Sequence, residues 1–361
     1  MTVFDVLEGG GHEQVVWCRD ERSGLRAIIA VHSTVLGPSL GGTRMRTYAS
    51  EGDALHDVLR LARGMTYKAA LAGLDLGGGK AVIWGNPLPG QREPRLRAYG
   101  RFVDSLGGRY ITAEDVGTTQ ADMDLVRQET RYVTGVSEAL GGSGDPSPFT
   151  ALGVVHAMSA VAAARWGDPG LGGLHVMVVG VGKVGSALVG ELAARGARVS
   201  VADANLDRVG AAVDLHGARP VAVEAALGEP CDILAPCALG GVLDTHSIAR
   251  LACAAVCGSA NNQLAEREDT ERLADAGILY VPDYVASAGG ISNLAGELQP
   301  VGYDRTRAID VVRAVGTTTA RVLALAREEA ITPVAAADRL AEARLAAAGL
   351  SPRRGRLAPR P

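Results

Sequence analysis

LHVMVVGVGKVG, residues 174–185, is the most informative stretch of this 361-residue chain. A run typical of a buried strand leads directly into the glycine pattern GxGxxG, which opens a helix. A second apolar segment, ARVSVAD, ends in Asp203, 18 residues after Gly185. Glycines at this turn let a pyrophosphate approach a helix N-terminus, and the carboxylate suits ribose hydroxyls. The pattern predicts a dinucleotide site that comprises Gly180, Val181, Gly182, Lys183, Val184, Gly185 and Asp203.

The carboxylate of Asp203 would repel a 2′-phosphate, which favours NAD over NADP, although Arg208 lies close in sequence. A glycine-rich turn that binds no nucleotide is the alternative interpretation. Around this motif the chain alternates strands and helices, as in a doubly wound parallel sheet. Six strands are expected near residues 174–180, 198–203, 219–222, 231–236, 254–258 and 278–282.

The first part of the chain carries two lysines and an aspartate in small-residue contexts. Strands are expected at 14–18 and 26–32, and a Gly/Pro-rich loop at 36–44. A capping box at Ser50 and Asp53 starts a helix that carries Lys68 near its end. The run GGGKAVIWG predicts a loop that enters a strand, with Lys80 at the strand's start. Asp115 follows the strand expected at 109–113, where α/β sheets place ligand sites.

Two ammonium groups that converge on one pocket would hold a carboxylate and lower each other's pKa. A lysine made neutral in this way can act as a base near neutral pH. The alternatives are that Lys68 and Lys80 are surface lysines in unrelated loops, and that Asp115 is a helix N-cap.

Composition limits the classes of function. The net charge of −4 implies no nucleic-acid partner, and the basic stretch at 352–356 is interpreted as a frayed terminus. The acidic N-terminus has no signal-peptide character, and no apolar run is expected to span a membrane. Five cysteines are interpreted as buried free thiols of a reducing cytosol, and the scattered histidines predict no metal site. A cytoplasmic location is therefore expected.

Beyond single motifs, the chain resembles the glutamate/leucine/phenylalanine/valine dehydrogenase family, above all its branched-chain members. The resemblance runs from EQVVWCRDERSGLRAII near the start to AADRLAEAR near the end. It includes LGPSLGGTRM, RLARGMTYK, AGLDLGGGK, GRYITAEDVGTT, GSGDPSP, APCALGG, GSANNQL and PDYV. It implies a nicotinamide enzyme that oxidatively deaminates an amino acid, and a homo-oligomer.

The resemblance implies roles for the residues that match it. Lys68 would bind the substrate α-carboxylate, with Gly41 and Gly42 lining the same end. Lys80 would be the catalytic lysine, and Asp115 its proton-shuttling partner.

On the cofactor side, Thr150 would hold the nicotinamide carboxamide, unless it only caps the helix at 149–166. Asn262, near the substrate carboxylate, has a plain turn former as its alternative. Further cofactor contacts would be Cys237, Ala238, Ala260 and Asn261.

The substrate side chain is expected to meet an apolar pocket. Its wall would comprise Leu40, Met65, Ala113, Ile291 and Leu294, each of which has ordinary core as its alternative. Leu40 stands where glutamate dehydrogenases carry a lysine, so a glutamate side chain would be desolvated without a partner. In AGGISNLAGEL (288–298), isoleucine and leucine replace the two valines of leucine enzymes, which predicts a preference for valine or isoleucine. Ser287 replaces the usual asparagine.

The expected architecture is α/β, with an N-terminal substrate and oligomerisation domain over 1–133 and a Rossmann domain over 134–329. A cleft between them is expected to close about hinges at 134–150 and 285–300. The helix near 330–350 is expected to pack on the first domain, and 351–361 to form a flexible basic tail. Rival functions are action on phenylalanine, tryptophan or an unusual biosynthetic amino acid, and a non-catalytic NAD-binding regulator.

Overall fold

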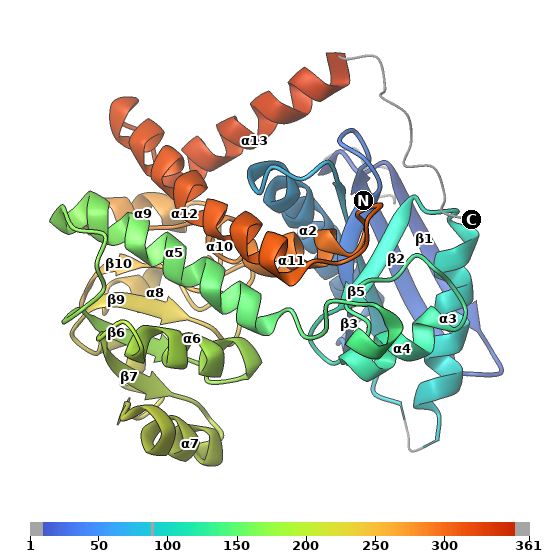
Figure 1. Cartoon of the computed structure of the whole chain (residues 1–361), viewed down its shortest axis with the longest axis horizontal. Helices are drawn as coiled ribbons and strands as arrows, with labels where there is room; N and C mark the ends of the chain where they lie inside the picture. The colour runs from blue at the N-terminus through green and yellow to red at the C-terminus, as the bar shows by residue number, and fades with distance from the viewer. Residues whose placement is uncertain (1–9, 88–89, 351–361) are drawn as a thin grey trace. The chain divides into compact units, whose positions relative to one another are not determined.

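A computed structural model of the protein describes residues 10–87 and 90–350. The interpretations of the extreme N-terminus and of the basic tail therefore lie outside the described residues. Two compact units make up the chain (Figure 1). Unit 1 is Met1–Asp145, Leu294–Arg305 and Ala341–Pro361, and unit 2 is Pro146–Asn293 and Thr306–Leu340. The chain leaves unit 1 after Asp145, inside the first segment expected to act as a hinge. It re-enters unit 1 at Leu294, inside the second such segment.

Unit 1 is built on a five-stranded mixed sheet of order β1-β2-β4-β3-β5. Its strands are β1 (Gln14–Asp20), β2 (Leu25–Ser33), β3 (Ser39–Arg46), β4 (Gly77–Trp84) and β5 (Tyr110–Glu114). β1, β2 and β4 pair antiparallel, whereas β3 runs parallel to both β4 and β5. The central strand β4 and its neighbour β3 carry the glycine-rich motifs.

Two sequence predictions are wrong here. The segment 36–44, expected to be a loop, mostly belongs to β3, and the three glycines before Lys80 belong to β4. Lys80 therefore lies in mid-strand and not at a strand start. Glycine usually weakens a strand, but these glycines are needed because other backbone lies against them. A Cβ on Gly41 would lie 1.7 Å from the carbonyl oxygen of Gly79.

Helices cover both faces of the unit 1 sheet. Its helices are α2 (Glu51–Leu71), α3 (Arg92–Ser105), α4 (Gln120–Arg127) and the short η1 (Glu138–Leu140). Alternate residues of β2 enter different cores: Ile28 packs with α2, and Ile29 lies in the core that α3 and α4 share. As predicted, Ser50 caps α2 by accepting a hydrogen bond from the backbone N–H of Asp53.

Unit 2 is a parallel sheet of six strands in the order β11-β10-β9-β6-β7-β8, which confirms the doubly wound fold. The strands are β6 (His175–Val179), β7 (Arg198–Ala202), β8 (Arg219–Pro220), β9 (Cys231–Pro236), β10 (Cys253–Val256) and β11 (Leu279–Tyr280). Helices of this half are α5 (Ser147–Trp166), α6 (Lys183–Ala193), α7 (Leu206–His216), η2 (Ala226–Gly228), α8 (Thr245–Ile248), α9 (Asp269–Asp275), α10 (Asp283–Ala286), α11 (Gly289–Gly296), α12 (Arg305–Glu328) and α13 (Pro333–Leu350). The strand order reverses between β6 and β9, where such sheets bind ligands.

Helix α5 corrects one expectation from the sequence. Contrary to the prediction that no segment suits a membrane, Ser147–Trp166 is long and apolar enough to cross one. More than half of its apolar window is buried inside the protein, as in the core helix of a folded domain.

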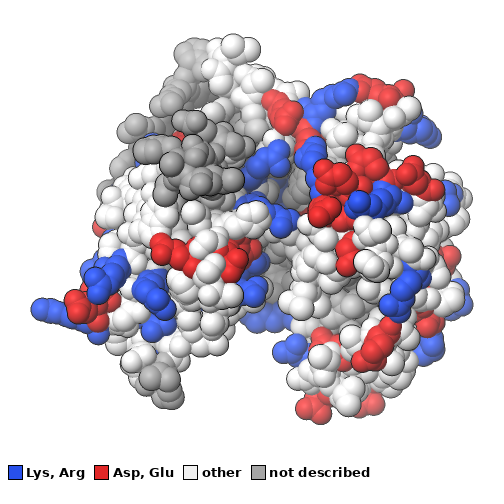
Figure 2. Space-filling view, turned by 180° about the vertical axis from the view of Figure 1, so that it is seen from behind, with Lys and Arg blue, Asp and Glu red and all other residues white. Residues whose placement is uncertain are grey.

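The last helix runs from unit 2 into unit 1. There Arg344 donates hydrogen bonds to the carbonyl oxygens of Ala69 and Ala70 at the end of α2. Arg344 also forms an ion pair with Asp75, and Tyr67 of α2 donates to Glu342. On the face in Figure 2, acidic and basic side chains are interspersed, as the nearly balanced composition implies.

Candidate active site

Lys68 and Lys80 lie on two elements of unit 1 that are in direct backbone contact. A Cβ on Gly78 of β4 would lie 2.0 Å from the backbone nitrogen of Thr66, so only glycine lets α2 sit this close. Lys68 follows Thr66 by two residues, and Lys80 follows Gly78 by two residues. Both lysines are buried, at 7% and 4% exposure, which excludes the interpretation as surface lysines in unrelated loops.

Lys80 forms a buried ion pair with Asp115. Residues two apart on a strand share a face, so Lys80 points to the α2 side of the sheet, like Gly78. Asp115 follows β5 directly, and its Oδ2 lies 3.2 Å from the Nζ of Lys80. The helix that follows is capped by Thr119, so the interpretation of Asp115 as an N-cap is wrong. Gly42 on β3 makes room for this carboxylate, because a Cβ there would lie 2.9 Å from the Cβ of Asp115.

A third charged residue, Arg44, completes the cluster and was not anticipated from the sequence. Its Nε lies 3.0 Å from the same Oδ2 atom of Asp115. Its Nη1 binds both carboxylate oxygens of Asp57 on α2, at 3.2 and 3.1 Å. The hydroxyl of Tyr48 donates to Asp57 as well, at 2.7 Å. The second cation beside Lys80 is therefore an arginine of β3.

The cluster shifts the pKa of both catalytic candidates. Burial would raise the pKa of Asp115, but Lys80 and Arg44 together hold it well below its usual value. Burial lowers the pKa of Lys80 by more than the charge of Asp115 raises it, and Arg44 lowers it further. Asp115 is thus a permanent acceptor, and Lys80 loses its proton more readily than a solvent-exposed lysine.

Three lysines occur in the whole chain, Lys68, Lys80 and Lys183, among 36 basic residues. All three are candidate site residues. Arginine replaces lysine easily on a surface, but a guanidinium stays protonated in proteins and cannot act as a base. This restricted use of lysine is a sequence signal for the site that motif reading alone overlooks.

In unit 2, the space around each glycine of the 180–185 turn explains why that position lacks a side chain. Gly180 has φ +101°, and a Cβ there would lie 2.7 Å from the backbone nitrogen of Ala238. A Cβ on Gly185 would lie 1.9 Å from the carbonyl oxygen of Gly180, so this glycine lets α6 pack close to β6. Beside Gly182, by contrast, the nearest atom is an Arg208 nitrogen at 4.0 Å, which leaves the backbone open to a ligand.

The carboxylate of Asp203 lies directly beside that turn. It accepts hydrogen bonds from the backbone nitrogens of Val181 and Asn205, both at 2.8 Å. Cys237 and Ala238, at the end of β9, belong to the same end of the sheet. An open glycine, the N-terminus of α6 and a carboxylate at the end of β7 fit a dinucleotide.

The remaining cofactor-side predictions involve Thr150 and the asparagines after β10. Thr150 lies inside the first turn of α5 and donates to the carbonyl of Pro146 at 3.1 Å, so it is not the cap. Asn262 has φ +53°, a conformation that asparagine tolerates, and its N–H donates to Asp283 at 2.9 Å. The turn-forming role of Asn262 is thus present, and Asp283 is a partner that the sequence did not reveal.

The residues of the predicted pocket wall are buried or half-buried and are divided between the two units. Leu40 is fully buried on β3, on the same face as Gly42 and Arg44, and Ala113 is buried on β5. Ile291 and Leu294 are buried and Met65 is half-buried, which fits ordinary core as well as a pocket. The hydroxyl of Ser287 donates to the carbonyl oxygen of Asp283 at 2.6 Å.

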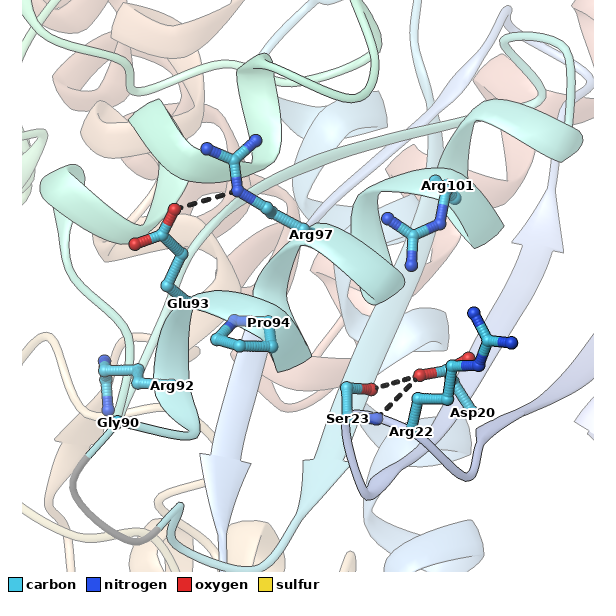
Figure 3. Close-up of a pocket in the computed structure, with 9 residues that line it drawn as sticks. All are labelled: Asp20, Arg22, Ser23, Gly90, Arg92, Glu93, Pro94, Arg97 and Arg101. Carbon is cyan, nitrogen blue, oxygen red and sulfur yellow. Dashed lines mark hydrogen bonds and ion pairs between the residues drawn. The ribbon is translucent and has the colours of Figure 1, made fainter.

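A cavity of about 910 Å³ in unit 1 contains none of the predicted site residues (Figure 3). It is lined by Asp20, Arg22, Ser23, Gly90, Arg92, Glu93, Pro94, Arg97 and Arg101. Three of its arginines form ion pairs: Arg92 with Asp122, Arg97 with Glu93 and Glu129, and Arg101 with Glu129. The lysine cluster therefore remains the candidate active site.

A nucleotide-binding parallel sheet and a buried lysine–aspartate pair define a pyridine-nucleotide-dependent amino-acid dehydrogenase. The chain belongs to the Glu/Leu/Phe/Val dehydrogenase family, as the resemblance indicated. Residues 12–132 match the model of the family's dimerisation domain, and residues 204–348 match that of the Glutamate/Leucine/Phenylalanine/Valine dehydrogenase domain.

Individual relatives agree with this assignment. The leucine dehydrogenase of Thermoactinomyces intermedius is 50% identical over 345 residues, which cover 96% of this chain and 94% of that protein. The valine dehydrogenase of Streptomyces coelicolor is 53% identical over 342 residues, 94% of this chain and 93% of that protein. Among solved structures, L-tryptophan dehydrogenase from Nostoc punctiforme superposes with a TM-score of 0.80 at 41% identity and covers 97% of this chain and 100% of that chain.

Proposed function

We propose that this protein catalyses the NAD-dependent, reversible oxidative deamination of an aliphatic branched-chain L-amino acid to its 2-oxo acid and ammonium. The observation that carries the proposal is the buried Lys80–Asp115 ion pair, with the lowered pKa of Lys80. It occurs in a chain that shares about half its residues with a leucine and a valine dehydrogenase.

The chemistry assigns a separate task to each residue of the cluster. A bound NAD would supply the acceptor for the hydride that leaves the α-carbon of the amino acid. The imino acid must then add water and lose ammonia, which requires a base that is neutral near the working pH. Lys80 takes the proton from the attacking water and returns it to the departing nitrogen. Asp115 accepts hydrogen bonds from that nitrogen, and Lys68 binds the substrate carboxylate.

NAD is favoured over NADP by the acid at the end of β7. The carboxylate of Asp203 lies beside the glycine turn, where a 2′-phosphate would meet its negative charge. Arg208 is the cation near this turn, with a nitrogen 4.0 Å from a Cβ placed on Gly182. A wild-type kcat/KM for NADP equal to that for NAD would contradict the proposal.

Valine, isoleucine and leucine fit the residues of the predicted pocket best. Leu40 offers no cation for a side-chain carboxylate, so glutamate would lose its hydration without a partner. Ile291 and Leu294 reduce the space by about one methylene each compared with valine, which is worth about 1–3 kcal/mol per methylene. The likeness to a tryptophan dehydrogenase makes tryptophan the second substrate to test.

We further propose a homo-oligomer in the cytoplasm. The family domain over residues 12–132 is a dimerisation domain by description, which supports self-association. All five cysteines are free, two buried and three half-buried, as suits a reducing compartment. Light scattering of the purified protein tests the first proposal, and fractionation of the producing cells tests the second.

The deciding experiment measures NAD reduction at alkaline pH with valine, isoleucine, leucine, phenylalanine, tryptophan and glutamate. We expect turnover led by valine or isoleucine, with leucine within about 10- to 100-fold in kcat/KM. A clear lead by tryptophan or phenylalanine would refute the aliphatic pocket. No turnover with any of them, while NADH still binds, would point to an unusual amino acid, and screening of 2-oxo acids with ammonium would follow.

A further inference from the structure

Arg44 occupies a position that the proposed reaction does not by itself explain. It lies on β3, in the middle of the sheet, and its side chain is only 12% exposed. One end of the guanidinium binds Asp115 after β5, and the other binds Asp57 on α2. Two acids on different elements therefore hold one arginine in a fixed orientation.

The contact with Asp115 uses the same oxygen that Lys80 uses. Oδ2 of Asp115 lies 3.0 Å from Nε of Arg44 and 3.2 Å from Nζ of Lys80. Two cations thus share one acceptor atom, and each is within the electrostatic reach of the other. A planar guanidinium held at both ends keeps the carboxylate from rotating towards Lys80 alone.

We propose that Arg44 is a positioning residue for the reaction, which fixes the carboxylate of Asp115 and keeps Lys80 in a state that readily releases its proton. The inference rests on the proposed function of Lys80 as the base. Arg44 does not touch the substrate in this account. It acts through Asp115, by geometry, and on Lys80, by charge.

The charges around Lys80 agree with this role. Asp115 and, more weakly, Asp57 favour its protonated form, whereas burial and Arg44 favour the neutral one. On the same face, β2 contributes His32, whose pKa burial lowers to about 4, so that it stays neutral during turnover. Arg44 is therefore the permanently charged group that opposes protonation of Lys80, because arginine does not titrate in this range.

The test compares the acidic limb of the pH profile of kcat for amino-acid oxidation in the wild type and four variants. Arg44→Gln removes the charge and keeps a hydrogen-bond donor, and Arg44→Lys keeps the charge without the two-ended bridge. Arg46→Gln is the matched control, because Arg46 is an exposed residue of the same strand. For Arg44→Gln we expect the limb to move to higher pH by about one unit, with kcat about tenfold lower on the limb.

Arg44→Lys and a fourth variant, Asp57→Asn, separate the effect of charge from that of position. In Arg44→Lys the limb stays near that of the wild type, while the plateau of kcat falls because the carboxylate is no longer fixed. Asp57→Asn releases the other end of the bridge but removes a negative charge, so its limb moves, if at all, to lower pH. A fall in kcat with no shift of the limb in Arg44→Gln would overturn the proposal, and so would shifts of the same sign in Arg44→Gln and Asp57→Asn.

A labelling experiment that needs no turnover tests the effect of Arg44 on Lys80 independently of the proposed function. Cyanate carbamoylates neutral amines, and the chain has only three lysines, so mass spectrometry can follow each one. At a fixed pH we expect Lys80 to react several-fold more slowly in Arg44→Gln than in wild type, with Lys183 unchanged. Equal rates at Lys80 would overturn the proposal even if the wild type proved inactive on every amino acid. If Arg44→Gln does not fold, Arg44→Lys and Asp57→Asn carry the test. An Arg44→Lys enzyme with the wild-type plateau of kcat, or an Asp57→Asn enzyme whose limb moves to higher pH, would overturn the proposal.

Discussion

Replacement of Gly42 by alanine should disable the active site by moving Asp115. A Cβ at this position would lie 2.5 Å from the carbonyl oxygen of Glu114 and 2.9 Å from the Cβ of Asp115. Ordinary contacts begin at about 3.4 Å, so the start of the segment after β5 must retreat by roughly 0.5–1 Å. The bonds from Asp115 to Lys80 and Arg44, now 3.2 and 3.0 Å long, cannot both survive such a shift.

The magnitude follows from two effects. Overpacking of this kind costs about 1–3 kcal/mol of stability, and a misplacement of about 1 Å costs about 100-fold in rate. We therefore expect kcat for valine oxidation to fall about 100-fold, with a loss of several degrees in Tm. NADH binding, followed by fluorescence, should change little, because the glycine turn lies in unit 2.

Gly64→Ala provides the control, because it makes the same chemical change in the same unit. Gly64 lies inside α2, and nothing stands within 4 Å of a Cβ there. It should stabilise the helix by about 0.5–1 kcal/mol and leave kcat unchanged. A Gly42→Ala enzyme with kcat within about twofold of wild type would refute the steric argument.

Three further predictions concern the lysine, the glycine turn and the ribose site. The rate of amino-acid oxidation should rise with pH through the pKa of Lys80, because the neutral amine is the active form, and the midpoint should lie below the usual lysine value of about 10.4. Lys80→Arg should lower kcat by at least about 100-fold at every pH. A Lys80→Arg enzyme that regained activity at high pH would contradict this. Gly185→Ala, whose Cβ would lie 1.9 Å from the Gly180 carbonyl oxygen, should weaken NADH binding at least about tenfold in a titration, and unchanged affinity would show that the turn has room to adapt. Asp203→Ser should narrow the ratio of kcat/KM for NAD over NADP by about tenfold or more, and an unchanged ratio would mean that another group sets the preference.

Much of unit 2 was predictable because its parallel strands are buried on both faces. Such strands appear as continuous apolar runs, and the run before Gly180 is bounded by glycine signals that set its length. The position of Asp115 was predictable for the same reason, as the first polar residue after β5.

The central strands of unit 1 were less predictable. Glycine-rich segments normally indicate loops, so β3 and the start of β4 were expected to be irregular. They are strands because neighbouring backbone occupies the space of the missing side chains, which a sequence does not display. The role of Arg44 was not predictable for a related reason, because its contact with Asp115 depends on the pairing of β3 with β5.

The contact between Gly78 and Thr66 limits how this enzyme can be altered. Because α2 packs directly against the backbone of β4 at Gly78, the helix and the strand form one rigid block that carries both lysines. The strand offers no side chain at that contact that could be exchanged to retune the spacing of the two amines. Engineering or natural divergence toward new substrates must therefore act at the periphery of the block, and a search for altered specificity can leave residues 66 and 77–79 out of its libraries.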